Sequence, residues 1–386
     1  MRELLAILEM NLRTVPQRWG ATLVVVVGMA CAVGALVAIL SMSSGFVRTA
    51  TMNGNPSRII VISDGAGGEW GSTISRGDAT ILSDMPGIRK DGARKPIVSA
   101  DYLAYTVVQK KSDGLDAYLG VRGMGPASAK LRPEIHLASG RMFRPGKYEL
   151  ITGRSAQALY EGLKEGDRVT MPEGEWLVTG TFETGGSATE SELLTDAATL
   201  LSAMRLSNYK SMTVLLDRPE DFDRFKRAVT TRPGPALSLQ REPDYMAEQS
   251  KWFTDLMQAL AYVVGGIMGL GAMFGALNTM YSAISARARE IATLRAIGFG
   301  GGAVVASVII EALVFSVAGA CIGIAIAWAL FDGNLRDMAG TAIRLTVTPE
   351  VALAAAGFAC LLGIVGGLFP ALKAARMPIA EALRAT

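Results

Sequence analysis

Four long apolar stretches constrain this chain more than any other feature. The first, at residues 20–47, has no Asp, Glu, Lys, Arg or His. As a helix it would reach roughly 42 Å at about 1.5 Å per residue. Three more stretches follow at 256–286, 303–330 and 351–372, each longer than the ~20 residues that a helix needs to cross a bilayer. Because 50% of the residues are hydrophobic and only 19% are charged, we expect a membrane protein.

A signal peptide is the competing interpretation of the first stretch, because three arginines precede it. The apolar core is longer than the ~7 to 15 residues of a signal peptide, and no clean small-x-small cleavage site closes it. We therefore expect an uncleaved transmembrane helix.

Positive charges are unequally distributed among the short segments that flank the stretches. They precede the first stretch, join the second to the third and follow the fourth, whereas the segment 331–350 holds only Arg336 and Arg344. The positive-inside rule then predicts that both termini and the segment 287–302 are cytoplasmic. The insert at 48–250 is expected outside, and the chain is expected to be a multi-pass protein of the inner (plasma) membrane.

The long insert has a pattern of its own and enough residues for a separate core. Alternating and helix-spaced apolar residues indicate mixed α and β structure. Strands are expected at 58–63 and 97–109, a hairpin at 167–182 around a turn at 172–175, and helices at 75–85 and 217–229. The predicted fold class is membrane α-helical with an α+β extracytoplasmic domain, with four transmembrane helices and the large insert between helices 1 and 2.

These patterns predict nine consecutive parts. Leu4, Leu8 and Leu12 share one side of the first segment, which is typical of a helix lying on the inner membrane surface. The expected order is a cytoplasmic amphipathic helix at 1–18, transmembrane helix 1 at 19–47, the extracytoplasmic domain at 48–250, transmembrane helix 2 at 251–286, a cytoplasmic coupling segment at 287–302, transmembrane helix 3 at 303–330, a short outer loop at 331–350, transmembrane helix 4 at 351–372 and a cytoplasmic tail at 373–386.

Several kinds of chemistry are missing from the sequence. There is no GxxxxGK[ST] motif to hold nucleotide phosphates, and His136 is the only histidine, so neither a multi-histidine metal site nor a serine-histidine triad is expected. Cys31, Cys321 and Cys360 lie in apolar stretches, where we expect small buried hydrophobes and no disulfides. A net charge of +3 without a basic cluster predicts no nucleic-acid partner. We expect no catalytic residue, no metal and no cofactor in this chain.

Small and acidic residues inside the stretches predict how the helices pack. Glycines four apart allow helix backbones to approach closely. Such pairs occur at Gly265 and Gly269, Gly271 and Gly275, Gly319 and Gly323, and Gly363 and Gly367. Glu311 is a buried intramembrane polar residue whose unpaired charge would cost about 2.5 to 3.5 kcal/mol. We expect it to pair with an inner-surface arginine or a backbone group, with a proton relay as the alternative.

The segment "ARAREIATLRAIGFGGG", at residues 286–302, is a charged helix between two apolar stretches. Ile284, Ala288, Ile291 and Leu294 form one stripe, which suits docking into a groove on a partner. Glycines then end the helix. A solvated loop that only fixes topology would need the arginines but neither Glu290 nor the apolar stripe.

The motif "RAREIATLRAIG" closely resembles the coupling segment of the MacB/FtsX superfamily of ABC-transporter permeases. "IIEALVFSVAGACIGI", "FPALKAARMPIAEALR" and "ELITGRSAQALYEGLKEGDRVTM" are similar to other parts of that family, so the resemblance covers nearly the whole chain. It implies a MacB-type permease without a fused ATPase domain. The ATPase-coupling residues that it implies are Arg287, Arg289, Glu290, Ile291, Leu294, Arg295, Ile297 and Gly298.

The resemblance also implies partners and a function. The partners would be an ABC ATPase that binds ATP and Mg, a second copy or a paralogue of the permease, a periplasmic adaptor and the lipid bilayer. The expected function is a non-catalytic subunit that couples ATP hydrolysis to movement of the outer domain for export or extraction of a substrate. The alternatives are FtsX-like or LolC/E-like mechanotransmission or lipoprotein release, and a membrane receptor with an extracytoplasmic binding module.

Overall fold

The computed structural model describes residues 19–172, 174–297, 300–338 and 340–378. The chain divides into two compact units. Unit 1 holds the described residues up to Ser44, Asp255–Asn334 and those from Leu345 onward, and unit 2 holds Gly45–Thr254 and Leu335–Arg344. The amphipathic helix expected at 1–18 and the end of the expected tail lie outside the described residues.

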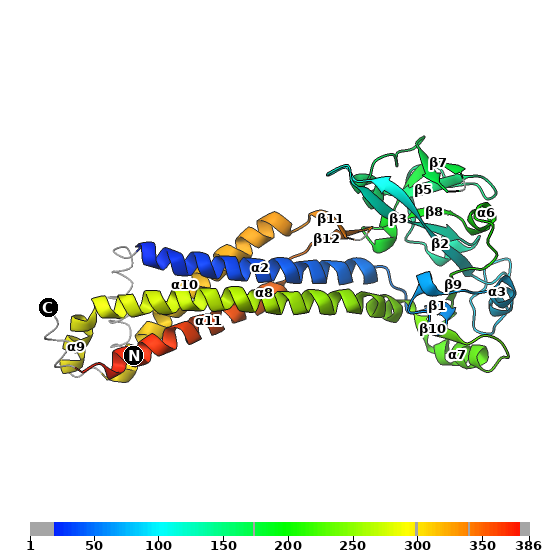
Figure 1. Ribbon diagram of the computed structural model, residues 1–386. Coiled ribbons are helices and arrows are strands. Elements are labelled where there is room, and N and C mark those ends of the chain that lie inside the picture. The colour runs from blue at the N-terminus through cyan, green and yellow to red at the C-terminus, as the bar shows by residue number, and fades with distance from the viewer. Residues whose placement is uncertain (1–18, 173, 298–299, 339, 379–386) are drawn as a thin grey trace. The chain divides into compact units, whose positions relative to one another are not determined.

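Unit 1 is built from long apolar helices that run side by side (Figure 1). Among the described residues, four helices are long and apolar enough to cross a membrane. They are α2 (Trp19–Thr51), α8 (Glu242–Ala286), α10 (Gly301–Phe331) and α11 (Pro349–Arg376), and a short helix, α9 (Ala288–Ala296), separates α8 from α10. Helix α8 begins at Glu242, before the start expected at residue 251, because its polar first turns give no apolar signal in the sequence. These first turns belong to unit 2.

The spanning helices pack through small residues. An added Cβ on Gly323 would lie 2.5 Å from the Ala30 carbonyl oxygen of α2, so only glycine lets α10 approach α2 this closely. Gly271 and Gly275 differ, because an added Cβ on either would meet nothing within 4 Å among the described residues. The expectation of close packing is therefore confirmed for α10, whereas Gly271 and Gly275 of α8 face away from the other described residues.

The cysteine expectation is wrong for two residues. Cys31 and Cys321 are exposed, and Cys360 is half-buried. An apolar helix in a membrane protein faces lipid as well as protein, so apolar surroundings in the sequence do not place a side chain in the protein core.

Unit 2 contains a ten-stranded mixed sheet. Its order is β10-β1-β9-β2-β3-β8-β5-β7-β4, with β6 paired to β7. The strands are β1 (Arg58–Ser63), β2 (Val98–Gln109), β3 (Asp116–Met124), β4 (His136–Gly140), β5 (Glu149–Gly153), β6 (Arg168–Met171), β7 (Gly174–Glu183), β8 (Leu193–Asp196), β9 (Ser211–Leu215) and β10 (Leu237–Arg241). The helices are α3 (Arg76–Ser83), α4 (Ser128–Leu131), α5 (Arg154–Leu159), α6 (Ala197–Ala203) and α7 (Phe222–Thr230), with 3-10 turns η2 (Glu69–Gly71), η3 (Ala188–Ser191) and η4 (Pro219–Asp221).

The local sequence patterns of the insert are confirmed at most positions, but the helix expected at 217–229 begins only at Phe222, after the 3-10 turn η4. The strands expected at 58–63 and 97–109 are β1 and β2, and the hairpin expected at 167–182 is the antiparallel pair of β6 and β7. Ser75 caps α3 by accepting the amide of Asp78, as the serine before that helix predicts.

Two hydrophobic clusters divide unit 2 into two lobes. The β9 lobe packs β1, β9 and β10 against α3 and α7 around Phe225. The β7 lobe packs β3, β5, β6, β7 and β8 with α5 and α6 around Trp176. Strand β2 joins the lobes, because Val98 to Asp101 pair with β9 whereas Tyr102 to Gln109 pair with β3.

The short outer loop expected at 331–350 is instead structured. It holds a two-stranded hairpin of β11 (Leu335–Met338) and β12 (Thr341–Arg344), which belongs to unit 2. Ala342 and Ile343 are fully or almost fully buried, and the Ser191 hydroxyl accepts the amide of Ala342 at 2.8 Å. Four-residue strands with mixed polarity give little sequence signal, because their stabilising contacts lie far along the chain.

Candidate functional site

The segment expected to dock on a motor forms α9, which a break in the backbone separates from α8. Helix α8 ends at Ala286, and Arg287 leaves the helical conformation with φ at −108° and ψ at 13°. The break lets α9 follow a different axis from α8 (Figure 1). Helix α9 is therefore a separate short helix that follows the long helix α8.

One side of α9 is anchored to the other helices of unit 1. Arg287 Nη1 lies 3.8 Å from Glu311 Oε2 of α10, and both side chains are nearly buried. Glu311 therefore pairs with an arginine, one of the two kinds of partner that the sequence left open. Ile291 is also buried, in a cluster with Ile284 and Val304. The stripe expected to enter a partner's groove thus packs, at Ile284 and Ile291, onto the chain's own helices.

The other side of α9 is open to solvent. Arg289 and Glu290 are exposed, and Ile297 is 72% exposed just after the helix. Arg295 is half-buried, and its Nη1 donates to the carbonyl of Met377 at 2.8 Å, so it links the end of α9 to the segment after α11. Leu294 lies within α9, and Gly298 lies outside the described residues. The structure therefore brings Arg289 and Glu290 to one exposed surface and turns Arg287 and Ile291 away from it.

A buried ionic network joins the two lobes of unit 2. Arg122 of β3 contacts Glu69 of η2 at 3.0 Å and Glu192 at 2.8 Å, while Asp101 lies 3.6 Å from it and 3.8 Å from Arg132. Burial tends to raise the pKa of Glu69, but the charge and hydrogen bonds of Arg122 lower it overall. Burial raises the pKa of Asp101 despite both arginines. The partners are far apart in sequence, so no local motif reveals the network.

Asp337 fastens the hairpin of β11 and β12 to the β7 lobe. Its carboxylate accepts the Tyr160 hydroxyl at 2.8 Å and the Gly340 amide at 3.0 Å, and it pairs with Lys110 Nζ at 2.6 Å. Burial and Asp337 together raise the pKa of the Tyr160 hydroxyl, and the hydrogen bond to Asp337 raises the pKa of Lys110. These contacts of Asp337 were not expected from the sequence, because in the sequence Asp337 resembles an ordinary loop aspartate.

No cluster of three or more His, Cys, Asp or Glu that could hold a metal ion occurs among the described residues. His136 is exposed on β4.

Among the described residues, four helices long and apolar enough to span a membrane and a large mixed domain, inserted between the first two, are the architecture of a multi-pass membrane protein. The family described as MacB-like periplasmic core domain matches residues 22–232, and the family described as FtsX-like permease C-terminal matches 262–379. The chain belongs to the MacB/FtsX superfamily of ABC-transporter permeases.

Curated relatives match over shorter segments. A macrolide export ATP-binding/permease protein MacB of Chlorobaculum tepidum is 35% identical over 110 residues, which cover 28% of this chain and 16% of that protein. An uncharacterised ABC transporter permease, YknZ of Bacillus subtilis, is 28% identical over 131 residues, which cover 34% of this chain and 32% of the relative. The chain therefore spans less than a third of the length of these two relatives.

Two solved structures show similarity to parts of the chain. The periplasmic region of MacB from Actinobacillus actinomycetemcomitans is 13% identical, with a TM-score of 0.39 over 50% of this chain and 92% of that one. The extracellular domain of the ABC-type transporter YknZ from Gram-positive bacteria is 14% identical, with a TM-score of 0.35 over 47% of this chain and 99% of that one.

Proposed function

We propose that this permease is the non-catalytic membrane subunit of an ABC system, and that an ATPase outside these 386 residues docks on α9. The observation that supports docking is the division of α9 into an anchored and an exposed side. Arg287 and Ile291 hold it to the bundle, while Arg289 and Glu290 are exposed. A push on the exposed side would reach α10 through the Arg287 to Glu311 pair.

The proposed work of the complex is movement of unit 2 for export or extraction of a substrate on the outer side of an inner membrane, with a periplasmic adaptor. Two connections support this proposal. Helices α2 and α8 continue into unit 2, and the hairpin between α10 and α11 is part of it. All four spans are thus joined to unit 2 by short lengths of chain, so displacement of the spans would pull on it at several points.

Purification of the tagged chain from its native membranes tests the docking. We expect an ABC ATPase and Mg-ATP hydrolysis to co-purify with the wild type, and both to fall at least tenfold in Arg289→Glu and in Glu290→Arg. Opposite charges on a partner would become like charges in these variants, which repel. Arg224→Glu, an exposed change on α7, is the matched control and should keep both. Full ATPase recovery with both α9 variants, together with normal function, would refute the docking.

The proposed topology places α9 and both termini in the cytoplasm. Labelling intact cells with a membrane-impermeant maleimide tests it in a variant whose native cysteines are replaced. Lys164→Cys, which is exposed in unit 2, should be labelled, and Ile297→Cys should react only after the membrane is opened. Labelling of both in intact cells would contradict the topology.

We also propose that two permease chains pair through α8. Gly271 and Gly275 line an uncovered face among the described residues, beside the exposed Ile267 and Phe274. Small residues four apart allow a second helix to pack closely. Leucine at both glycines should shift the chain from dimer to monomer in light-scattering measurements, and an unchanged mass would exclude this face.

A further inference from the structure

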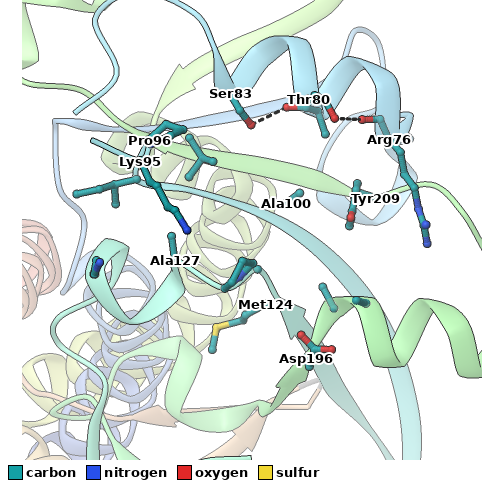
Figure 2. Close-up of a pocket in the computed structure, with 18 of the residues that line it drawn as sticks. Arg76, Thr80, Ser83, Lys95, Pro96, Ala100, Met124, Ala127, Asp196 and Tyr209 are labelled. Atoms are coloured by element: carbon teal, nitrogen blue, oxygen red, sulfur yellow. Dashed lines mark hydrogen bonds between the residues drawn. The ribbon is translucent and has the colours of Figure 1, made fainter. Parts of the chain in front are cut away.

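A cavity of about 650 Å³ lies between the two lobes of unit 2. One wall comes from α3 of the β9 lobe, with Thr80, and the opposite wall comes from Met124, Ala127 and Ala198 beside the β7 lobe. Figure 2 shows these walls facing one another, with Ala100 of the joining strand between them. Cavities of this size are typical of small-molecule sites.

The cavity lies at the point where β2 changes partners. Ala100 lines the cavity, whereas the next residue, Asp101, is fully buried in the ionic network. Successive side chains of a strand point to opposite faces of a sheet. Buried charges therefore connect the two lobes on one face of β2, and the cavity separates them on the other face. Strand β2 is thus placed as a hinge beside a cleft.

The two lobes are attached to different spanning helices. Helix α2 leads into β1 and β10 leads into α8, and both strands belong to the β9 lobe. The hairpin between α10 and α11 is instead fastened to the β7 lobe through Asp337 and Tyr160. A displacement of one helix pair relative to the other would therefore act on the two lobes separately.

The charges of the cleft indicate the kind of ligand. Lys95 extends towards Ala127 (Figure 2) and has no carboxylate partner among the described residues. Arg76 lies at the other end of the cleft from Lys95 (Figure 2), where its Nε donates to the backbone carbonyl of Ser207 at 3.2 Å. The acids there are already engaged, since Asp91 pairs with Lys130 at 2.6 Å. The other acid, Asp196, caps α6 by accepting the amide of Thr199.

We propose that this cleft binds a small amphipathic anion, with its acidic group at Lys95 and its apolar body against Ala100, Met124 and Ala127. Displacement of the lobes changes the width of the cleft and thereby loads or releases the ligand. The proposed binding of an anion in the cleft rests only on the structure of unit 2. The coupling of release to ATP rests on the proposed function.

Binding of 8-anilinonaphthalene-1-sulfonate to the full chain in phosphatidylcholine nanodiscs tests the site, with empty discs subtracted. We expect saturable fluorescence, which weakens at least tenfold in Lys95→Glu. Thr80→Trp and Ala127→Trp, which fill the cleft from opposite walls, should abolish it. Lys147→Glu is the matched control, because this lysine is exposed and outside the cleft, and it should leave the affinity unchanged. The neutral analogue N-phenyl-1-naphthylamine should bind at least tenfold more weakly.

Absence of a saturable component in the wild type would overturn the site, as would equal binding by all variants. Equal affinity for the neutral analogue would overturn the anionic class. The Arg289→Glu variant separates this proposal from the docking proposal, since it should lose the ATPase and keep probe binding. Unchanged probe affinity when Mg-ATP is added to the intact complex would overturn the coupled release.

Discussion

Arg122 lies at the centre of the buried ionic network that joins the two lobes of unit 2. Its guanidinium contacts Glu69 and Glu192, and Asp101 lies within 4 Å of it. Removal of one member of a buried ion pair is far more costly than removal of a surface charge, because the partner is left charged and desolvated.

We therefore predict that Arg122→Met lowers the free energy of unfolding by about 3 to 5 kcal/mol. A change of that size lowers the melting temperature of a domain of this length by about 10 °C. Thermal unfolding of the full chain in detergent, followed by size-exclusion chromatography, measures it. Arg168→Met is the matched control, because Arg168 forms only an exposed pair with Glu175 and should change stability by under about 1 kcal/mol. Equal melting temperatures for the two variants would contradict the importance of the network.

Glu149 gives unit 2 a specific dependence on acid. Two hydrogen bonds from Arg141, at 2.6 and 2.8 Å, and one from the Arg144 amide lower the pKa of Glu149 to about 2. Its ordinary pKa is about 4.3. A carboxylate whose pKa is lowered by folding stabilises the native state above its unfolded pKa and loses this contribution as the pH falls through the folded one.

We predict that wild type exceeds Glu149→Gln in stability by about 1 kcal/mol at pH 6, because screening at the exposed Arg141 limits the contribution. The difference should shrink between about pH 4.3 and pH 2. Melting temperatures of both proteins across that range measure it, and a difference independent of pH would contradict the role of this carboxylate.

At the scale of elements, the approach of α10 to α2 depends on a missing side chain. Gly323→Ala would bring a Cβ to 2.5 Å from a backbone oxygen, which cannot rotate away as a side chain can. We predict a loss of about 1 to 3 kcal/mol from overpacking, measured as a lower melting temperature in detergent. Gly357→Ala on α11 is the control, because its Cβ would meet nothing within 4 Å among the described residues. If the two variants melt alike, α10 and α2 do not pack as described.

Elements with local patterns were predictable from the sequence, and elements held by distant contacts were not. The four spans follow from hydropathy, β1 follows from its run of apolar β-branched residues, and α3 follows from the serine that precedes it, all within a few residues of chain. The hairpin of β11 and β12 could not be predicted, because its Asp337 is hydrogen-bonded to a tyrosine, Tyr160, that lies 177 residues earlier in the chain.

The candidate site was predictable in position but not in orientation. The charged segment between two spans marks α9, and the resemblance to the permease family adds its residues. Which of these side chains face inward depends on Glu311 of α10 and on the cluster around Ile291, and a helical stripe alone does not say which surface it covers. The exposure of Arg289 and Glu290 could therefore be determined only from the folded structure.

At the scale of the whole molecule, the hairpin of β11 and β12 is the part of unit 2 that lies between α10 and α11 in the chain. We predict that Asp337→Ala leaves ATPase association unchanged but increases deuterium uptake in β11 and β12 by severalfold, because the carboxylate fastens the hairpin through Tyr160 and Lys110. Asp113→Ala, an exposed change in the neighbouring turn, is the control. Unaltered exchange in the hairpin would show that Asp337 does not fasten it.

The late position of this hairpin in the chain has a consequence for biogenesis. About 80 residues separate the end of the main part of unit 2 at Thr254 from Leu335, and they include most of α8, α9 and α10. At a synthesis rate of about 5 to 20 residues per second, a ribosome needs on the order of 4 to 16 s to make them. Throughout that interval nascent unit 2 lacks the hairpin that contacts Tyr160 and Ser191, so its final folding step waits for synthesis of α8, α9 and α10.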